Sequence, residues 1–115
     1  MLSRHKEKIL LVDDERSILD VASEYFTLKG YEVLTATNGR EAMDIINQGS
    51  IDCCFTDINM PEMDGLELAE LIRRKDNSVP VIIMTGYPSL DNTIQTLKNG
   101  VVDFLIKPEI GRAHV

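Results

Sequence analysis

The chain has 115 residues, of which 43% are hydrophobic and 27% are charged, values that are ordinary for one soluble globular domain with a buried core. Its formal net charge of -7 argues against a general binder of nucleic acid or anionic membranes, because neither a phosphate backbone nor an anionic lipid attracts an acidic surface. No apolar run is long enough to span a membrane, and the charged start, Met1 to Lys8, has no signal-peptide core.

Apolar runs and amphipathic stretches alternate along the chain, without a linker, repeat or low-complexity segment, which predicts alternating strands and helices. The apolar runs are continuous rather than alternating, which is typical of strands covered on both faces and hence of a parallel sheet between helices. The expected strands are 9–12, 32–37, 51–56, 80–84 and 101–106, and the expected helices are 15–29, 39–48, 66–74 and 88–99.

The expected helices have suitable residues at their ends and on their inner faces. Asn38 is a good N-cap for the second helix, and Gly30, Gly49 and Gly100 follow helix ends. The inward stripes are expected to hold Ile18, Ala22, Tyr25 and Phe26 in the first helix, Ala42, Ile45 and Ile46 in the second, and Leu68, Leu71 and Ile72 in the third.

The two cysteines, Cys53 and Cys54, are adjacent on the third expected strand. Neighbouring strand residues point to opposite faces, so this pair is poorly placed for a disulfide or a shared metal. We interpret both as buried core thiols of a protein that works in a reducing cytoplasm.

Charged side chains stand where three of the expected strands end. Asp13 and Asp14 follow the first strand, Asp57 follows the third, and Lys107 follows the fifth. In an open parallel α/β sheet the carboxyl ends of the strands meet at one crevice, where ligands bind. Carboxylates brought close together repel each other, and a hard divalent cation such as Mg²⁺ relieves this, takes oxygen ligands and usually brings phosphate with it. The pattern therefore predicts phosphate chemistry on a carboxylate.

Each of these residues has a simpler interpretation when it is taken alone. An aspartate after a strand is usually a turn residue or a helix N-cap, and a single lysine is more often solvated. Thr85 ends the fourth strand and Gly86 leaves room for a ligand, although a threonine at a strand end is unremarkable by itself. Their shared position at the strand ends of one predicted sheet is what favours a common site.

The motifs that carry a family resemblance are Leu10–Glu15, Thr56–Pro61 with Met63–Gly65, Met84–Gly86 and Phe104–Pro108. From about Lys8 to Pro108 the chain resembles a response-regulator receiver domain. The resemblance implies a three-layer, doubly wound, flavodoxin-like fold with five parallel strands in the order 2-1-3-4-5, followed by a fifth helix. It also implies a cytoplasmic phospho-accepting switch that receives its phosphoryl group from a histidine kinase or a histidine-containing phosphotransfer protein. Such a domain catalyses only its own phosphorylation and dephosphorylation.

The resemblance gives the strand-end residues their roles. Asp57 matches the phospho-acceptor, whose carboxylate attacks phosphorus to form an acyl phosphate. Lys107 matches the ammonium that pairs with a phosphoryl oxygen. Asp14, Asp57 and the backbone carbonyl of Asn59 match the ligands of Mg²⁺ or Mn²⁺, and Asp13 matches the other acidic position of the metal site.

Four further positions are matched in the same way. Thr85 and Phe104 match the switch pair, in which the hydroxyl bonds a phosphoryl oxygen and the aromatic ring rotates into the vacated space. Phe104 also has the simpler interpretation of core packing. Asn59 and Tyr87 match the positions that tune dephosphorylation, and the bulk of Tyr87 predicts a phosphoryl lifetime longer than that of the fastest chemotaxis-type members. Pro108 implies a cis Lys–Pro bond that aims the lysine inward.

The tail, 109–115, departs from the family pattern. Glycine and charged residues interrupt it and it has no apolar stripe, so it is a poor match to the expected fifth helix. We expect the receiver domain to span 1–108 and the tail to be non-native, because a widely used sequencing adapter encodes Ile110–Val115 in one reading frame. Uninterrupted genomic DNA that codes for this tail would contradict that expectation.

Two other classes of protein share parts of the pattern. A Mg²⁺-dependent aspartate-nucleophile phosphohydrolase also forms an acyl phosphate. Such an enzyme usually has a cap domain, and it usually has an aspartate two residues after the nucleophile, at the position that Asn59 occupies in this chain. An electron-transfer flavodoxin shares the fold, but no phosphate-binding loop rich in Ser, Thr or Gly follows the first strand. The cognate kinase, the output domain and a phosphorylation-dependent dimer of the full-length protein are left open by the sequence.

Overall fold

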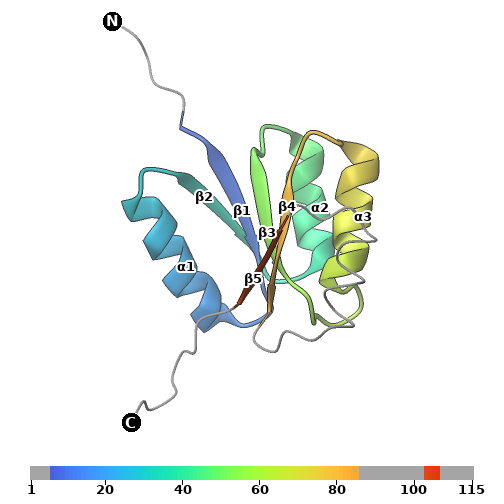
Figure 1. The fold of residues 1–115 in the computed structure, drawn as a ribbon, viewed down its shortest axis with the longest axis horizontal. Coiled ribbons are helices and arrows are strands. Elements are labelled where there is room, and N and C mark those ends of the chain that lie inside the picture. Colours follow the sequence, from blue (N-terminus) through green and yellow to red (C-terminus); the bar gives the residue numbers. More distant parts are fainter. Residues whose placement is uncertain (1–5, 86–102, 107–115) are drawn as a thin grey trace, which may run out of the picture.

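The computed structural model describes residues 6–85 and 103–106, which form a sheet with helices on both of its faces (Figure 1). The elements in chain order are β1 (Lys8–Val12), α1 (Arg16–Leu28), β2 (Glu32–Ala36), α2 (Gly39–Gln48), β3 (Cys53–Asp57), α3 (Gly65–Lys75), β4 (Val81–Thr85) and β5 (Asp103–Ile106). The predicted helix at 88–99, the fifth helix, the cis Lys–Pro bond and the tail 109–115 lie outside the described residues.

The strands pair in parallel in the order β2-β1-β3-β4-β5, which confirms the predicted doubly wound α/β fold and its strand order. Helix α1 lies on one side of the sheet, and α2 and α3 lie on the other (Figure 1). β1 and β3 are neighbours, and Val12 at the end of β1 stands opposite Thr56 in β3. The residues that follow these two strands therefore leave the sheet at the same end.

The sheet divides the core into two layers, and each central strand contributes to both. Ile9 and Leu11 of β1 face the α1 layer, whereas Leu10 and Val12 face the layer of α2 and α3. All four side chains are at most 4% exposed, as expected for a continuous apolar run covered on both faces. The larger cluster also contains Ala42, Ile46, Leu68, Ala69, Ile72, Val81 and Ile83, and the smaller one Leu19, Phe55 and Met84.

The adjacent cysteines belong to different layers, as predicted from the alternation of side chains along a strand. Cys54 is fully buried in the larger cluster, as predicted. The prediction of a buried thiol is wrong for Cys53, which is only half-buried and packs against the smaller cluster at the edge of the hollow described below. Both thiols are free, and burial raises the pKa of Cys54 far above that of an exposed thiol.

Two side chains that were predicted to face inward are exposed instead. Tyr25 of α1 is 55% exposed, and Leu71 of α3 is 36% exposed. Tyr25 directly precedes Phe26, and Leu71 directly precedes Ile72; Phe26 and Ile72 both pack in the core. Consecutive residues of a helix are about 100° apart around its axis, so Tyr25 and Leu71 point to the side of the buried stripe. The buried stripe of α3 continues through Ala69 instead, because a small side chain allows the helix to lie close to the strands.

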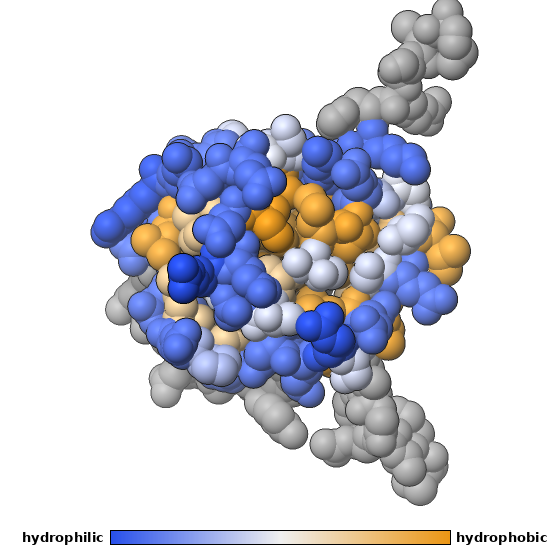
Figure 2. Space-filling view, turned by 180° about the vertical axis from the view of Figure 1, so that it is seen from behind, coloured by the Kyte–Doolittle hydropathy of each residue, from blue (hydrophilic) through white to orange (hydrophobic). Residues whose placement is uncertain are grey.

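Exposed apolar side chains also occur elsewhere on the described surface. Figure 2 shows one face of the molecule, on which hydrophobic side chains emerge between hydrophilic ones. Among the residues whose burial is described, Val21 and Leu28 of α1 join Tyr25 and Leu71 as exposed large hydrophobic residues. Across the residues that the structure describes, no helix has the length and apolar character needed to cross a membrane.

Helix α2 begins and ends where the sequence predicted, and its N-cap is formed by side-chain hydrogen bonds. Asn38 accepts a hydrogen bond from the backbone N–H of Glu41 at 2.9 Å. The Glu41 carboxylate accepts in turn from the backbone N–H and the hydroxyl of Thr37, at 2.7 and 2.8 Å, and these bonds lower the pKa of Glu41. The Asn38 side chain thus satisfies one amide group of the first helical turn that has no helical acceptor, and the Glu41 carboxylate ties the residue before the cap to the helix.

Replacing Asn38 by alanine is expected to lower the free energy of unfolding by about 1 kcal/mol, because the N-cap bond to Glu41 is lost. Urea denaturation of the parent and the variant at 25 °C measures the difference. Asn47→Ala, at an exposed position inside the same helix, is the matched control and should not destabilise the protein. An equal loss in both variants would show that the cap is not the cause.

Candidate functional site

Three of the predicted site residues meet at the carboxyl ends of β1 and β3. Asp13 and Asp14 follow β1 directly, and Asp57 is the last residue of β3. Each offers one carboxylate oxygen, and these three oxygens lie within 4.8 Å of one another. Asp13 is 0% exposed and Asp57 is 5% exposed, whereas Asp14 is open to solvent. The cluster therefore consists of two buried carboxylates and one that is open to solvent.

The turn between β1 and α1 fixes Asp13. Its backbone N–H donates to the carbonyl of Ala36 at 3.1 Å, which extends the sheet contact with β2 by one residue. Its carboxylate accepts from the backbone N–H of Glu15 at 2.9 Å, and α1 starts at the next residue, Arg16. This is the turn chemistry that an aspartate after a strand commonly provides. Here the same side chain also contributes an oxygen to the cluster.

The loop between β3 and α3 holds Asp57 and the backbone that follows it. The Asp57 carboxylate accepts from the backbone N–H of Asn59 at 3.4 Å. The N–H of Ile58 donates to Met84 of β4 at 3.2 Å, and the N–H of Gly65 donates to the carbonyl of Ile58 at 2.9 Å. Ile58 and Met60 are both buried in the larger core cluster, so the loop is packed on the core on both sides of the Asn59 backbone.

Two residues contact the backbone carbonyl of Asp57, and sequence reasoning missed both. The buried hydroxyl of Thr56 donates to this carbonyl at 3.0 Å. Gly65, the first residue of α3, lies so close that a Cβ atom there would overlap the carbonyl oxygen. The sequence pattern predicted a loop at Gly65 and indicated only a strand position for Thr56. A glycine directly after the N-cap Asp64 was the signal that could have pointed to a close backbone contact.

The other predicted site residues are placed by the backbone or lie outside the described residues. Thr85 ends β4, and Phe104 lies in β5 opposite Ile83 of β4. The two switch positions are thus on neighbouring strands, while their side chains lie outside the described part of the structure. Lys107 and Tyr87 also lie outside it.

The donor set of the cluster suits a hard divalent cation. Carboxylate oxygens are the ligands that Mg²⁺ and Mn²⁺ prefer, and three negative charges within 4.8 Å of one another favour a cation between them. Asp13, Asp14 and Asp57 would hold the ion, together with the backbone carbonyl of Asn59 in the loop packed beside Asp57. The residues present therefore fit the predicted metal, with the acidic groups at the end of a parallel sheet where ligands bind.

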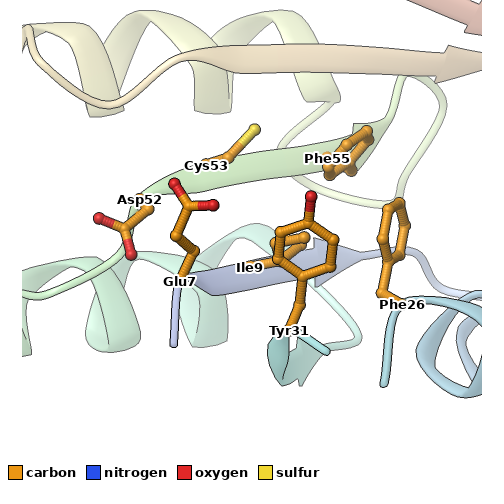
Figure 3. Close-up of a pocket in the computed structure, with 7 residues that line it drawn as sticks. All are labelled: Glu7, Ile9, Phe26, Tyr31, Asp52, Cys53 and Phe55. Carbon is orange, nitrogen blue, oxygen red and sulfur yellow. The ribbon is translucent and has the colours of Figure 1, made fainter. Parts of the chain in front are cut away.

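A hollow lies on the α1 side of the sheet, at the opposite ends of β1 and β3 from the acid cluster (Figure 3). Its lining is mainly apolar, with the Cys53 thiol and the carboxylates of Glu7 and Asp52 at one side. Burial raises the pKa of Cys53, and the negative charges of Glu7 and Asp52 raise it further. A thiol held protonated in this way is a poor nucleophile, so Cys53 is not a candidate nucleophile.

Fold and site together define a doubly wound α/β domain with an acidic crevice at the carboxyl end of its sheet. The family model described as the response regulator receiver domain matches residues 9–113, and the chain belongs to this family. It is therefore a receiver domain of phosphorylation-based two-component signal transduction, a type of domain that typically signals rather than acts as an enzyme. The match favours this class over the phosphohydrolase and the flavodoxin.

Individual relatives agree with the family. The transcriptional regulatory protein ZraR of Klebsiella oxytoca is 38% identical over 107 residues, which are 93% of this chain and 24% of that protein. The chain thus spans about a quarter of that curated relative.

Solved structures agree as well. Chemotaxis protein CheY4 of Vibrio cholerae matches with a TM-score of 0.87 and 32% identity, covering 91% of this chain and 89% of that one. Response regulator TrrA of Thermotoga maritima, solved in complex with Mg²⁺-BeF, matches with a TM-score of 0.81 and 33% identity, covering 90% and 89%.

Proposed function

We propose that this chain accepts a phosphoryl group on Asp57 in a Mg²⁺-dependent reaction, from a phosphohistidine of a sensor histidine kinase or a histidine phosphotransfer protein. The observation that carries the proposal is the gathering of the Asp13, Asp14 and Asp57 carboxylates within 4.8 Å at the end of a parallel sheet. The Mg²⁺-BeF complex of TrrA supports it, because it shows that a similar response regulator takes up the same ion.

The described residues prepare Asp57 for this reaction. One carboxylate oxygen accepts from the Asn59 N–H, so the side chain is held toward the crevice. The other oxygen attacks phosphorus, the new O–P bond forms as the N–P bond of the phosphohistidine breaks, and the imidazole leaves with the electron pair. Bound Mg²⁺ supplies neutralisation of the negative charge on the carboxylates and the phosphoryl oxygens. We assign Lys107 to a phosphoryl oxygen as a second positive charge.

The switch pair, Thr85 and Phe104, is proposed to respond to the phosphoryl group by a change of conformation. Thr85 lies on β4, next to the strand that ends in Asp57, and Phe104 lies on β5, on the far side of β4. We assign to the Thr85 hydroxyl a bond to a phosphoryl oxygen and to Phe104 the coupled rotation, which alters this face for a partner or an output domain. Asn59 and Tyr87 are assigned to the tuning of dephosphorylation. The protein is proposed to act in the cytoplasm, where such kinases present their phosphohistidine.

Incubation with Mg²⁺ and a small acyl-phosphate donor is expected to add a single, labile phosphoryl group to the parent protein. Intact-mass spectrometry at short intervals measures the adduct, and Asp57→Asn should reduce it below detection because an amide cannot act as the nucleophile. Omission of Mg²⁺ is the second control. An equal adduct in Asp57→Asn, or no adduct in a sample shown to be folded by circular dichroism, would contradict the proposed function.

A further inference from the structure

The backbone carbonyl of Asp57 lies where the pairing of β3 with β1 has ended. On the β1 side the register stops with Val12 opposite Thr56, one residue before Asp57. On the β4 side the pairing continues, since Asp57 stands opposite Met84 and the N–H of Ile58 donates to Met84. In a trans peptide the carbonyl of Asp57 points away from that N–H, and therefore away from β4. The ladder thus anchors one side of the Asp57–Ile58 peptide group.

The hydroxyl of Thr56 acts on the other side of the same peptide group. It donates to the Asp57 carbonyl at 3.0 Å, and the Thr56 side chain is 0% exposed. Water therefore does not compete for this bond, and a buried carbonyl that loses its donor is costly. Valine has nearly the same shape as threonine but offers no donor, so this one interaction can be removed with little change in packing.

Gly65 closes the arrangement from the start of α3. A Cβ at this position would overlap the carbonyl oxygen of Asp57 and would lie 3.0 Å from the Cα of Ile58. The N–H of Gly65 also donates to the carbonyl of Ile58 at 2.9 Å. The first residue of α3 is therefore seated directly on the two peptide groups that follow the Asp57 side chain.

We propose that Thr56 and Gly65 are positioning residues of the phospho-acceptor, which clamp the Asp57–Ile58 peptide group between a hydroxyl donor and a close backbone contact. The inference rests on the proposed function of Asp57. A fixed peptide group sets the direction of the Asp57 carboxylate on one side and of the Asn59 backbone on the other. Two of the metal ligands assigned above therefore depend on the clamp, although neither clamp residue touches the metal or the phosphoryl group.

Thr56→Val and Thr56→Ser test the clamp in the 115-residue protein. Three quantities are measured for each: the urea free energy of unfolding, the Mg²⁺ dissociation constant by calorimetry, and the rate of adduct formation at saturating Mg²⁺ and acyl-phosphate donor. For Thr56→Val we expect the Mg²⁺ affinity and the saturated rate each to fall about 10-fold or more, as is usual when a supporting hydrogen bond behind a metal site is lost. Thr56→Ser retains the donor and should stay within about twofold of the parent in both.

A merely structural role predicts a different pattern. If Thr56→Val lowers the free energy of unfolding but leaves both the Mg²⁺ affinity and the saturated rate of the folded protein within about twofold of the parent, the clamp proposal is overturned. Thr56→Cys, whose thiol is a weak donor of similar size, replaces the valine variant if that variant does not fold. A parent protein that binds Mg²⁺ but forms no adduct at Asp57 would refute the proposed function, and the Mg²⁺ affinities alone would then decide on the clamp.

Discussion

Asp14→Asn is expected to stabilise the metal-free protein and to remove most of its stabilisation by Mg²⁺. In the parent, three carboxylate oxygens lie within 4.8 Å of one another, and removing one charge relieves about 1 kcal/mol of repulsion for a group open to solvent. Mg²⁺ at a hundred times its dissociation constant stabilises a protein that binds it only when folded by about 2.7 kcal/mol, which for a chain of this size raises Tm by roughly 10 °C.

Thermal unfolding followed by circular dichroism, with Mg²⁺ and with a chelator, measures both effects. Asp20→Asn is the matched control, because it removes the same charge from an exposed position on α1 that is not part of the cluster. The control should keep the full response to Mg²⁺. A response to Mg²⁺ that survives unchanged in Asp14→Asn would remove Asp14 from the metal site, and an equal loss in both variants would point to total charge instead.

Gly65→Ala is expected to lower the free energy of unfolding by about 3 kcal/mol, because its Cβ would overlap the Asp57 carbonyl. A clash with backbone cannot be relieved by a change of rotamer, so either α3 or the end of β3 has to move. The alanine recovers at most about 1 kcal/mol from its higher helix propensity, which does not offset the clash.

Gly39→Ala provides the comparison within the same fold. Gly39 is also the first residue of a helix and also follows an N-cap, but a Cβ there would meet the flexible side chain of Met63. This substitution should lower the free energy of unfolding by less than Gly65→Ala does, because the Met63 sulfur atom can swing away, and the Cβ and Cγ of Met63, 3.1 Å from the added Cβ, need to shift only slightly. Urea denaturation of both variants decides. If both variants lose the same free energy of unfolding, the contact of Gly65 with the Asp57 backbone is not what destabilises Gly65→Ala.

Much of the fold could be predicted from the sequence because its local signals agree with one another. The N-cap Asn38 and the following Gly49 gave α2 its correct bounds, and continuous apolar runs identified the buried parallel strands. Tyr25 and Leu71 were assigned wrongly because a helical period of 3.6 residues locates the middle of an apolar stripe better than its margins. Which side chain at a margin is covered depends on where the sheet ends, and this is a tertiary property.

The candidate site, like the fold, could be predicted from the sequence only in part. The carboxyl ends of parallel strands meet at one crevice, and this rule was enough to predict that Asp13, Asp14 and Asp57 lie together. The glycine after the N-cap Asp64 was a signal of a close backbone contact, but that the contact of Gly65, like that of Thr56, is with the Asp57 carbonyl could not be predicted, because it depends on the path of the backbone between β3 and α3. The roles of Lys107, Thr85, Phe104 and Tyr87 stay predictions from the family resemblance.

The neighbouring thiols Cys53 and Cys54 differ in their access to solvent, and this difference provides a built-in measure of motion in the core. One belongs to the layer under α1 and the other to the layer under α2 and α3, although a single peptide bond separates them. Cys53 is half-buried and lines the hollow, so an alkylating reagent is expected to reach it in the folded protein, whereas Cys54 is fully buried and is reached only when its layer opens. Modification of Cys54 relative to Cys53 therefore records opening of the core under α2 and α3, without any label being introduced.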